Sequence, residues 1–205
     1  MKRSEIRERH HNFPYFASLH TGYVRRINML QTYKDQLPDY AKDLKLNLTQ
    51  VLSESPSSEL SNQQITGVAL AVAYATRNRQ LIELIFQKAE AELDESTLQA
   101  IKAAASIMAM NNIYYRFVHL VKDSEYQRLP ANLRMNIIAN PGIDKKDFEL
   151  YSLAVSAING CGLCIDAHAN TLIKSGLSKH SIQHVIRIAA VLNGLAQVSI
   201  IENKT

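Results

Sequence analysis

Apolar side chains recur every three to four positions along most of the chain, which is the spacing of one face of an α-helix. Alanine, leucine and isoleucine form this pattern, and the alternating β-branched runs typical of strands are absent from the sequence. Glycine and proline, which interrupt helices, are scarce at 7 and 5 residues. The pattern therefore predicts an all-α protein.

The periodicity predicts eight helices, and local signals support several of their ends. Asp94 and Ser178 are suitable N-cap residues, and Gly176 suits the position after a helix C-terminus. Asp144 with Asp147 three positions later resembles a capping box. The expected helices are Asp39–Ser53, Asn62–Thr76, Arg79–Glu92, Glu95–Met110, Ile113–Val121, Lys145–Ile158, Cys164–Lys174 and Lys179–Ile200.

Two stretches of the chain resemble each other. When residues 153–168 are shifted back by 83 positions, "LAVSAINGCGLCIDAH" lies over "LAVAYATRNRQLIELI" at 70–85. With one further residue of offset, residues 177–192 lie over 93–108, and the apolar positions agree in both segments. This self-similarity predicts a tandem duplication of a helical unit, with pseudo-repeats at about 62–110 and 145–193.

The two units differ in their reactive side chains. Only the C-terminal unit carries a C-x-x-C motif, and it has four polar or reactive groups that its counterpart lacks. This difference within one chain indicates that the second set is there for chemistry. The four residues are Glu149, Cys161, Cys164 and His168, where the first unit has Thr66, Asn78, Leu81 and Ile85.

Several features of this stretch favour a thiolate, the reactive form of a cysteine whose free thiol has a pKa of ~8.5. "INGCGLC" at 158–164 ends one helix and starts the next, so the thiols lie near a helix N-terminus, which favours negative charge. The C-x-x-C spacing places the two sulfurs about one turn apart, where they can form a disulfide. His168 lies four positions after Cys164 on the same helix face and can exchange a proton with it. Glu149 reaches the site, and orients the imidazole, if its helix packs antiparallel to the next one.

The chemistry that this set implies is peroxide reduction through a dithiol–disulfide cycle. We expect Cys164 to attack the peroxide, because it lies one turn into the helix and nearest to His168. Cys161, expected at the exposed edge, would resolve the sulfenic acid, supply a proton and exchange with an external dithiol. Glu149 and His168 would relay protons. No bound cofactor or metal is expected.

Each residue also has a simpler interpretation. A C-x-x-C motif with His168 and Glu149 as further ligands would suit zinc, an alternative that we rank well below redox chemistry. Glu149 alone would serve as a first-turn helix acid. His180 and His184 lack the H-E-x-x-H pattern and are expected on a polar helix face, whereas Met108 and Met110 are expected in the core.

The charge of the chain is concentrated at its start. Of 23 basic and 19 acidic residues, six basic and two acidic ones lie in residues 1–28, so the rest of the chain is neutral. We therefore expect 1–28 to be a basic, poorly ordered extension and 29–205 to be a single helical domain that binds neither nucleic acid nor membrane. The charged N-terminus has no apolar secretory segment, which favours a cytoplasmic location.

Three segments resemble the alkyl hydroperoxide reductase D (AhpD) family, part of the carboxymuconolactone-decarboxylase-like superfamily. They are "LPDYAKDLKLNLTQVL" (37–52), "AMNNIYYRFVHLV" (109–121) and "LPANLRMNIIANPGIDKKDFELYSLAVSAINGCGLCIDAH" (129–168). The resemblance covers residues 29–200, and its E-x11-C-x-x-C-x3-H pattern is specific. One position departs from it, because Leu163 stands between the cysteines where family members carry a second histidine.

The resemblance implies an all-helical fold, a homotrimer and lipoyl-dependent peroxidase activity on alkyl hydroperoxides. It also implies a partner peroxiredoxin, AhpC, and reduction by the lipoyl domain of a dihydrolipoamide acyltransferase, which lipoamide dehydrogenase reduces in turn. The family's attacking cysteine falls on Cys164, its resolving cysteine on Cys161, and its proton relay on Glu149 and His168. Two alternatives stay open. The chain could be a pure redox adaptor with negligible peroxidase activity of its own, or a carboxymuconolactone-decarboxylase-like enzyme.

Overall fold

The computed structural model describes residues 29–203, so the extension expected at residues 1–28 lies outside the described part. The chain divides into two compact units, one that ends at Gln36 and one that begins at Leu37. In the first unit, residues 29–35 are helical, and Gln31 Nε2 donates to Asp35 Oδ1 one turn later at 2.9 Å. The predicted domain of residues 29–205 stays a prediction.

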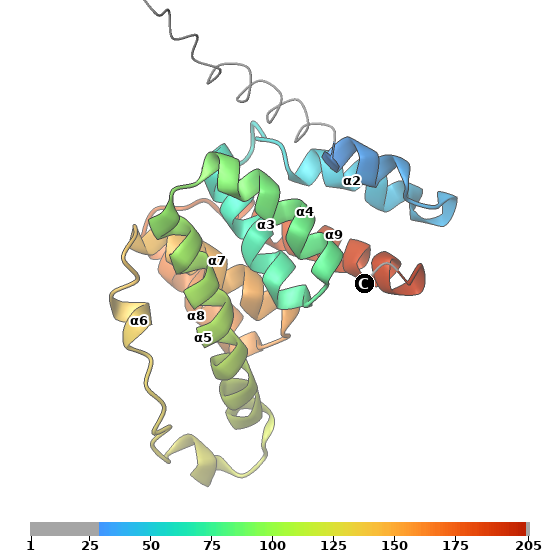
Figure 1. Cartoon of the computed structure of the whole chain (residues 1–205). Helices are drawn as coiled ribbons and strands as arrows, with labels where there is room; N and C mark the ends of the chain where they lie inside the picture. The colour runs from blue at the N-terminus through green and yellow to red at the C-terminus, as the bar shows by residue number, and fades with distance from the viewer. Residues whose placement is uncertain (1–28, 204–205) are drawn as a thin grey trace, which may run out of the picture. The chain divides into compact units, whose positions relative to one another are not determined.

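The second unit contains only helices among its described residues, and it confirms the all-α prediction (Figure 1). Two of the segments are short 3-10 helices, η1 and η2. The elements in chain order are η1 (Asp39–Ala41), α2 (Lys42–Val51), α3 (Asn62–Thr76), α4 (Arg79–Glu92), α5 (Glu95–Leu120), η2 (Ser124–Gln127), α6 (Asn136–Ala139), α7 (Lys145–Ile158), α8 (Gly162–Lys174) and α9 (Lys179–Ile201).

Helices α3 and α7 form the centre of this unit. Each has nine consecutive buried residues, 65–73 in α3 and 148–156 in α7, because each is apolar around most of its circumference. α3 packs against α4, α5, α7 and α9, and α7 packs against α5, α8 and α9 (Figure 1). Gly67 permits the close approach of the two central helices, since a Cβ there would lie 2.5 Å from Oη of Tyr151.

The helix starts follow the offset found in the sequence. α3 and α7 start 83 residues apart, as do α4 and α8, and α5 and α9 start 84 residues apart. The N-cap residues match as well, with Ser61, Asn78 and Asp94 in the first half and Asp144, Cys161 and Ser178 in the second. The two halves therefore share one arrangement of helix boundaries, and their origin in a duplication stays a prediction.

Long-range polar contacts account for two differences from the expected helices. The expected helices Glu95–Met110 and Ile113–Val121 are one helix, α5, because Asn112 donates its amide to Ser156 Oγ on α7 at 2.9 Å instead of turning to its own backbone. The capping box at Asp144 does not form either. Asp144 accepts from Lys146 N at 2.7 Å, and Asp147 accepts instead from Gln64 Nε2 on α3 at 2.7 Å.

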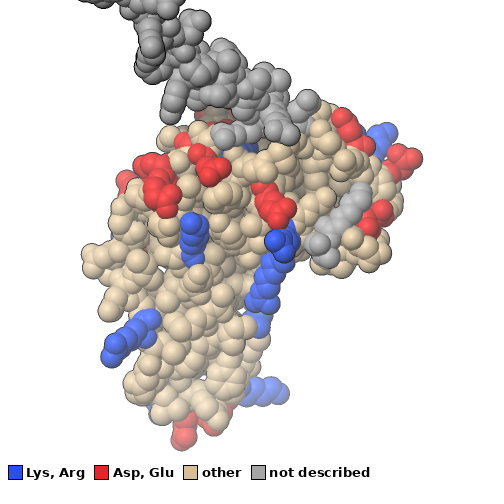
Figure 2. Space-filling model, in the orientation of Figure 1, with Lys and Arg blue, Asp and Glu red and all other residues tan. Residues whose placement is uncertain are grey.

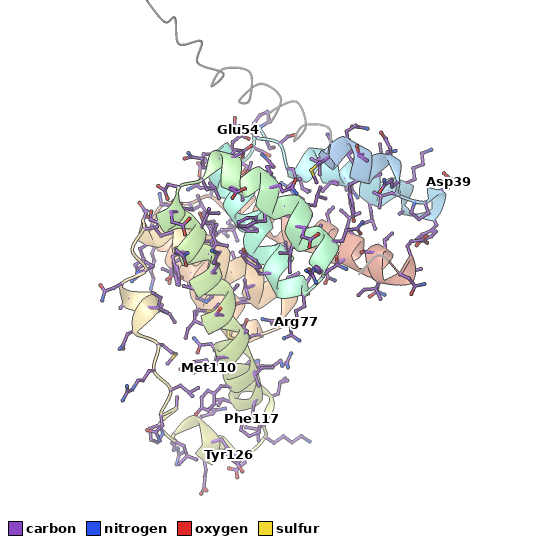
Figure 3. The ribbon with its side chains drawn as sticks, viewed as in Figure 1. Asp39, Glu54, Arg77, Met110, Phe117 and Tyr126 are labelled. Atoms are coloured by element: carbon purple, nitrogen blue, oxygen red, sulfur yellow. A yellow bond between two sulfur atoms is a disulfide. The ribbon has the colours of Figure 1, made fainter. Side chains whose placement is uncertain are left out.

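The segment between α5 and α7 is fixed at its start by an aromatic pair. The rings of Phe117, near the end of α5, and Tyr126, in η2, meet edge to face with centroids 5.2 Å apart (Figure 3). The face shown in Figure 2 carries both basic and acidic side chains. Residues 29–205 contain equal numbers of the two kinds.

Between residues 29 and 203, one helix is long and apolar enough to cross a membrane by length and composition, and this helix is α9. Half of its most apolar window is buried inside the protein. The buried side chains include Val185, Ile188, Leu192 and Leu195 on the face that packs against α3 and α7. The apolar character of α9 is therefore accounted for by the core of the second unit.

Candidate functional site

The two cysteines lie where the chain passes from α7 to α8. Gly160 adopts a left-handed conformation with φ +65°, which glycine reaches without steric strain. This conformation reverses the chain after Asn159. Cys161 is the N-cap residue of α8, and its Sγ accepts a hydrogen bond from the backbone N–H of Cys164 at 3.3 Å. Both sulfurs therefore lie in the first turn of α8, where free N–H groups favour negative charge.

The sulfurs of Cys161 and Cys164 are joined in a disulfide, with their Cα atoms 5.3 Å apart. Both residues are buried, with 0% of Cys161 and 7% of Cys164 exposed. The expectation that Cys161 lies at an exposed edge is therefore wrong. Its sulfur folds back over the first turn of α8 to accept from the N–H of Cys164, and this contact is buried.

Glu149 and His168 come together from neighbouring helices, as expected. Oε2 of Glu149 on α7 lies 2.6 Å from Nδ1 of His168 on α8. Only 5% of Glu149 and 9% of His168 is exposed, so the pair lies in a region of low dielectric constant. The position of Glu149 rules out the simpler interpretation of a solvated first-turn acid.

The second imidazole nitrogen faces a sulfur atom. Nε2 of His168 lies 3.3 Å from Sδ of Met108 on α5, and both residues are buried. Cys164 lies one helical turn before His168, on the same buried side of α8. The apolar pattern predicts Met108 as an ordinary core residue, and no signal in the sequence distinguishes a methionine beside an imidazole from any other.

A chain of hydrogen bonds ties α5 to the turn that carries the disulfide. Arg116 donates from Nη1 to the carbonyl oxygen of Asn159 at 2.7 Å, and Asn159 donates from Nδ2 to Oδ1 of Asn112 at 3.0 Å. Asn112 in turn donates to Ser156 on α7. In the sequence, nothing predicts this network except two adjacent asparagines inside an apolar helical pattern.

His184 lies inside the protein, so its predicted place on a polar helix face is wrong. Its Nε2 lies 2.9 Å from the carbonyl oxygen of Val51, and its Nδ1 lies 3.0 Å from Oγ of Ser58. The side chain thus joins α9 to the loop after α2, whereas His180 is exposed. Within residues 29–203, no three His, Cys, Asp or Glu side chains form a group that could hold a metal ion.

Comparison with known proteins identifies the family. A protein of Coxiella burnetii (strain Dugway), named alkyl hydroperoxide reductase AhpD, is 99% identical over 177 residues, which are 86% of this chain and all of that protein. A protein of Maricaulis maris with the same name is 54% identical and covers 82% of this chain and 96% of its own length. The chain belongs to the AhpD family. An AhpD of Rhodopseudomonas palustris is 50% identical over 167 residues, 82% of this chain and 91% of its own.

A second family model matches part of the chain. The sequence profile of the carboxymuconolactone decarboxylase family matches residues 124–199, which run from η2 to α9. The matched part contains the disulfide, Glu149 and His168, whereas Met108, Asn112 and Arg116 on α5 lie outside it. The AhpD relatives, which match over more than four-fifths of this chain, therefore carry the assignment.

Proposed function

We propose that the chain reduces alkyl hydroperoxides through a dithiol–disulfide cycle of Cys161 and Cys164. The observation that carries the proposal is the disulfide between the chain's only two cysteines, formed in the first turn of α8 one turn from a buried Glu149–His168 pair. Oxidation of a dithiol to a disulfide supplies two electrons, which is what reduction of one hydroperoxide requires.

The cycle begins with the reduced pair. Cys164 gives its thiol proton to His168, and the thiolate that remains attacks the distal oxygen of the hydroperoxide. The O–O bond breaks, and the leaving alkoxide takes the proton from His168 to become an alcohol. Cys164 is now a sulfenic acid. The Cys161 thiol attacks this sulfur, the thiol proton and the sulfenic hydroxyl leave together as water, and the disulfide forms.

The surroundings support Cys164 as the attacking sulfur. It is the more exposed of the two, at 7% against 0%, and it lies nearer along α8 to His168. Glu149 holds the imidazole at Nδ1 and stabilises its positive charge once the proton has arrived. Cys161 is the resolving sulfur, because it lies one turn away within bonding distance.

The reductant in this proposal is the dihydrolipoyl group of an acyltransferase that lipoamide dehydrogenase keeps reduced. A dihydrolipoyl thiolate attacks the disulfide, and its second thiol then closes the lipoyl ring and releases both cysteines as thiols. Because Cys161 is buried, exchange at that sulfur requires the first turn of α8 to open. The peroxiredoxin AhpC as electron acceptor, a homotrimer and a cytoplasmic location belong to the same proposal.

Two other functions make different predictions. A pure redox adaptor would show negligible peroxide reduction until AhpC is added. A decarboxylase is favoured by the family profile over residues 124–199, and its activity would survive alkylation of both thiols.

The test uses the full chain with cumene hydroperoxide and dihydrolipoamide, and it follows peroxide consumption. We expect steady turnover by the wild type and none by Cys164→Ser. With peroxide and no dihydrolipoamide, Cys161→Ser should consume about one peroxide per chain and remain a sulfenic acid, because it lacks the sulfur that resolves it.

Three results would count against the proposal. Full turnover by either variant contradicts the assigned roles, and a dependence of all turnover on added AhpC favours the adaptor. Peroxide reduction that persists after both thiols are alkylated excludes the cycle itself.

A further inference from the structure

The imidazole of His168 lies between two groups. When Glu149 is ionised, neither group has a hydrogen to donate, so both can act only as hydrogen-bond acceptors. On one side is the carboxylate of Glu149, 2.6 Å from Nδ1. On the other is the thioether of Met108, 3.3 Å from Nε2. A thioether sulfur has no hydrogen to give and is a weak acceptor. Both contacts are buried, so no water competes for either nitrogen through an open surface.

Counting protons shows which states this arrangement favours. If Glu149 is ionised and both imidazole nitrogens carry hydrogens, both contacts are hydrogen bonds. Both contacts are also hydrogen bonds if the proton between Glu149 and Nδ1 sits on Glu149, so that Nε2 is the only ring nitrogen that carries a hydrogen. If one proton is removed, the neutral imidazole keeps its hydrogen on Nδ1 for the carboxylate, and the bare Nε2 lone pair faces the sulfur lone pairs of Met108.

We propose that Met108 is a positioning residue that keeps a hydrogen on Nε2 of His168 and so holds the Glu149–His168 pair in its proton-loaded state. The two loaded states have the same number of protons, and they differ only in the place of one proton along the short Glu149–His168 contact. Without the sulfur of Met108, a hydrogen on Nε2 has no acceptor, which disfavours both loaded states.

This inference rests on the proposed function for its chemical meaning. In the reduced chain, the loaded pair is the state reached once the proton of Cys164 has moved to His168, so an acceptor for the hydrogen on Nε2 favours the thiolate before peroxide arrives. The hydrogen on Nε2 is also available for the leaving alkoxide. Because a thioether is a weak acceptor, the imidazole can turn from Met108 toward Cys164, one helical turn away, at a small cost.

In the described part of the chain, Glu149 is the one ionisable side chain that is hydrogen-bonded or ion-paired with the imidazole. α8 packs against α5, α7 and α9. Arg116 of α5 donates to a backbone carbonyl in the turn after α7, and His184 of α9 is bonded to a backbone carbonyl at the end of α2. Asp166, on α8 itself, is exposed to solvent. Glu149 is therefore the charged group that acts on His168 both in the wild type and in the Met108 variants.

The test follows the two nitrogens of His168 directly. Long-range ¹H–¹⁵N spectra of the oxidised chain, labelled at histidine, report which nitrogen carries hydrogen between pH 4.5 and 9, and His168→Gln identifies the signal. We expect Nε2 of the wild type to carry hydrogen at neutral pH. In Met108→Leu, the ratio of chains with a hydrogen on Nε2 to chains with a bare Nε2 should fall about three- to tenfold at a given pH, the size of one neutral hydrogen bond.

Two controls separate the sulfur from its packing. Met110→Leu alters the other methionine of α5, which is half-buried, lies two positions after Met108 on another side of the helix and is labelled in Figure 3. Replacing the five methionines by selenomethionine keeps an acceptor of the same shape, whereas norleucine removes the acceptor and keeps the shape. The wild-type ratio is expected with Met110→Leu and selenomethionine, and the lowered ratio with norleucine.

A bare Nε2 in the wild type at pH 7 would overturn the inference, as would a Met108→Leu or norleucine protein with the wild-type ratio. These spectra need neither peroxide nor reductant. A chain that shows the lowered ratio but does not reduce peroxides would therefore refute the proposed function and leave the role of Met108 intact.

Discussion

The replacement of Glu149 by glutamine tests the proton relay most directly. Glutamine has the same shape as glutamate, and its amide oxygen can still accept the hydrogen of Nδ1 of His168. What it removes is the negative charge 2.6 Å from the imidazole, in a place where 5% of one residue and 9% of the other is exposed. The substitution therefore separates the orientation of His168 from the stabilisation of its positive charge.

The size of the effect follows from the two kinds of hydrogen bond. A bond to a charged group contributes about 1.5–3 kcal/mol, and a bond between neutral groups about 0.5–1.5 kcal/mol. The difference of roughly 1–1.5 kcal/mol corresponds to about one pH unit. Because His168 then accepts the Cys164 proton less readily, alkylation of Cys164 at pH 7 should slow about tenfold. Peroxide reduction at pH 7 should fall about tenfold.

The assay measures the iodoacetamide reaction of the reduced chain between pH 5 and 10, with mass spectrometry of the peptides to distinguish Cys164 from Cys161. Glu90→Gln, at an exposed position in α4, is the matched control. Thermal unfolding of each variant, followed in parallel, identifies a protein that does not fold. An unchanged alkylation rate at pH 7 in folded Glu149→Gln, or an equal fall in Glu90→Gln, would refute the reasoning.

Two further predictions concern the fold. Gly67→Ala places a methyl group 2.5 Å from Oη of the buried Tyr151, so overpacking should outweigh the gain in helix propensity and lower the free energy of unfolding in urea by about 1–2 kcal/mol. Stability equal to the wild type would contradict this. The backbone N–H of Thr97, followed by the hydroxyl of Ser96, holds the pKa of Asp94 below its usual value. This N-cap therefore stabilises the fold above the unfolded pKa of about 3.9, and its contribution is lost as the pH falls through the folded value. Between pH 5 and pH 3 the melting temperature should fall further in the wild type than in Asp94→Asn, and equal falls would contradict the prediction.

The local features of the fold could be predicted well from the sequence. The expected bounds Asn62–Thr76, Arg79–Glu92 and Lys145–Ile158 are those of α3, α4 and α7, because caps and hydrophobic periodicity are local signals. The differences arise where a polar side chain has a partner far along the chain. Asn112 reads as a helix break until Ser156 and Asn159 are placed beside it.

The same division holds for the site. Spacing along one helix places Cys161, Cys164 and His168 within two turns at the start of α8, and the packing of α7 against α8 brings Glu149 to His168, as expected. The burial of Cys161 depends on the direction of a capping side chain, and the contact of Met108 depends on how α5 crosses α8. Neither is encoded in the spacing of residues on one helix.

The hydrogen bond from Cys164 N–H to Sγ of Cys161 affects how inactive variants should be made. In the first half of the chain the same position holds Asn78, whose inert amide accepts from Leu81 N–H in the same way. An alanine at position 161 would delete an electron-carrying atom and also fray the start of α8, the helix that aims His168. Serine, a strong helix-starting residue, removes the redox chemistry and leaves that turn closed, so the loss it causes can be attributed to sulfur alone.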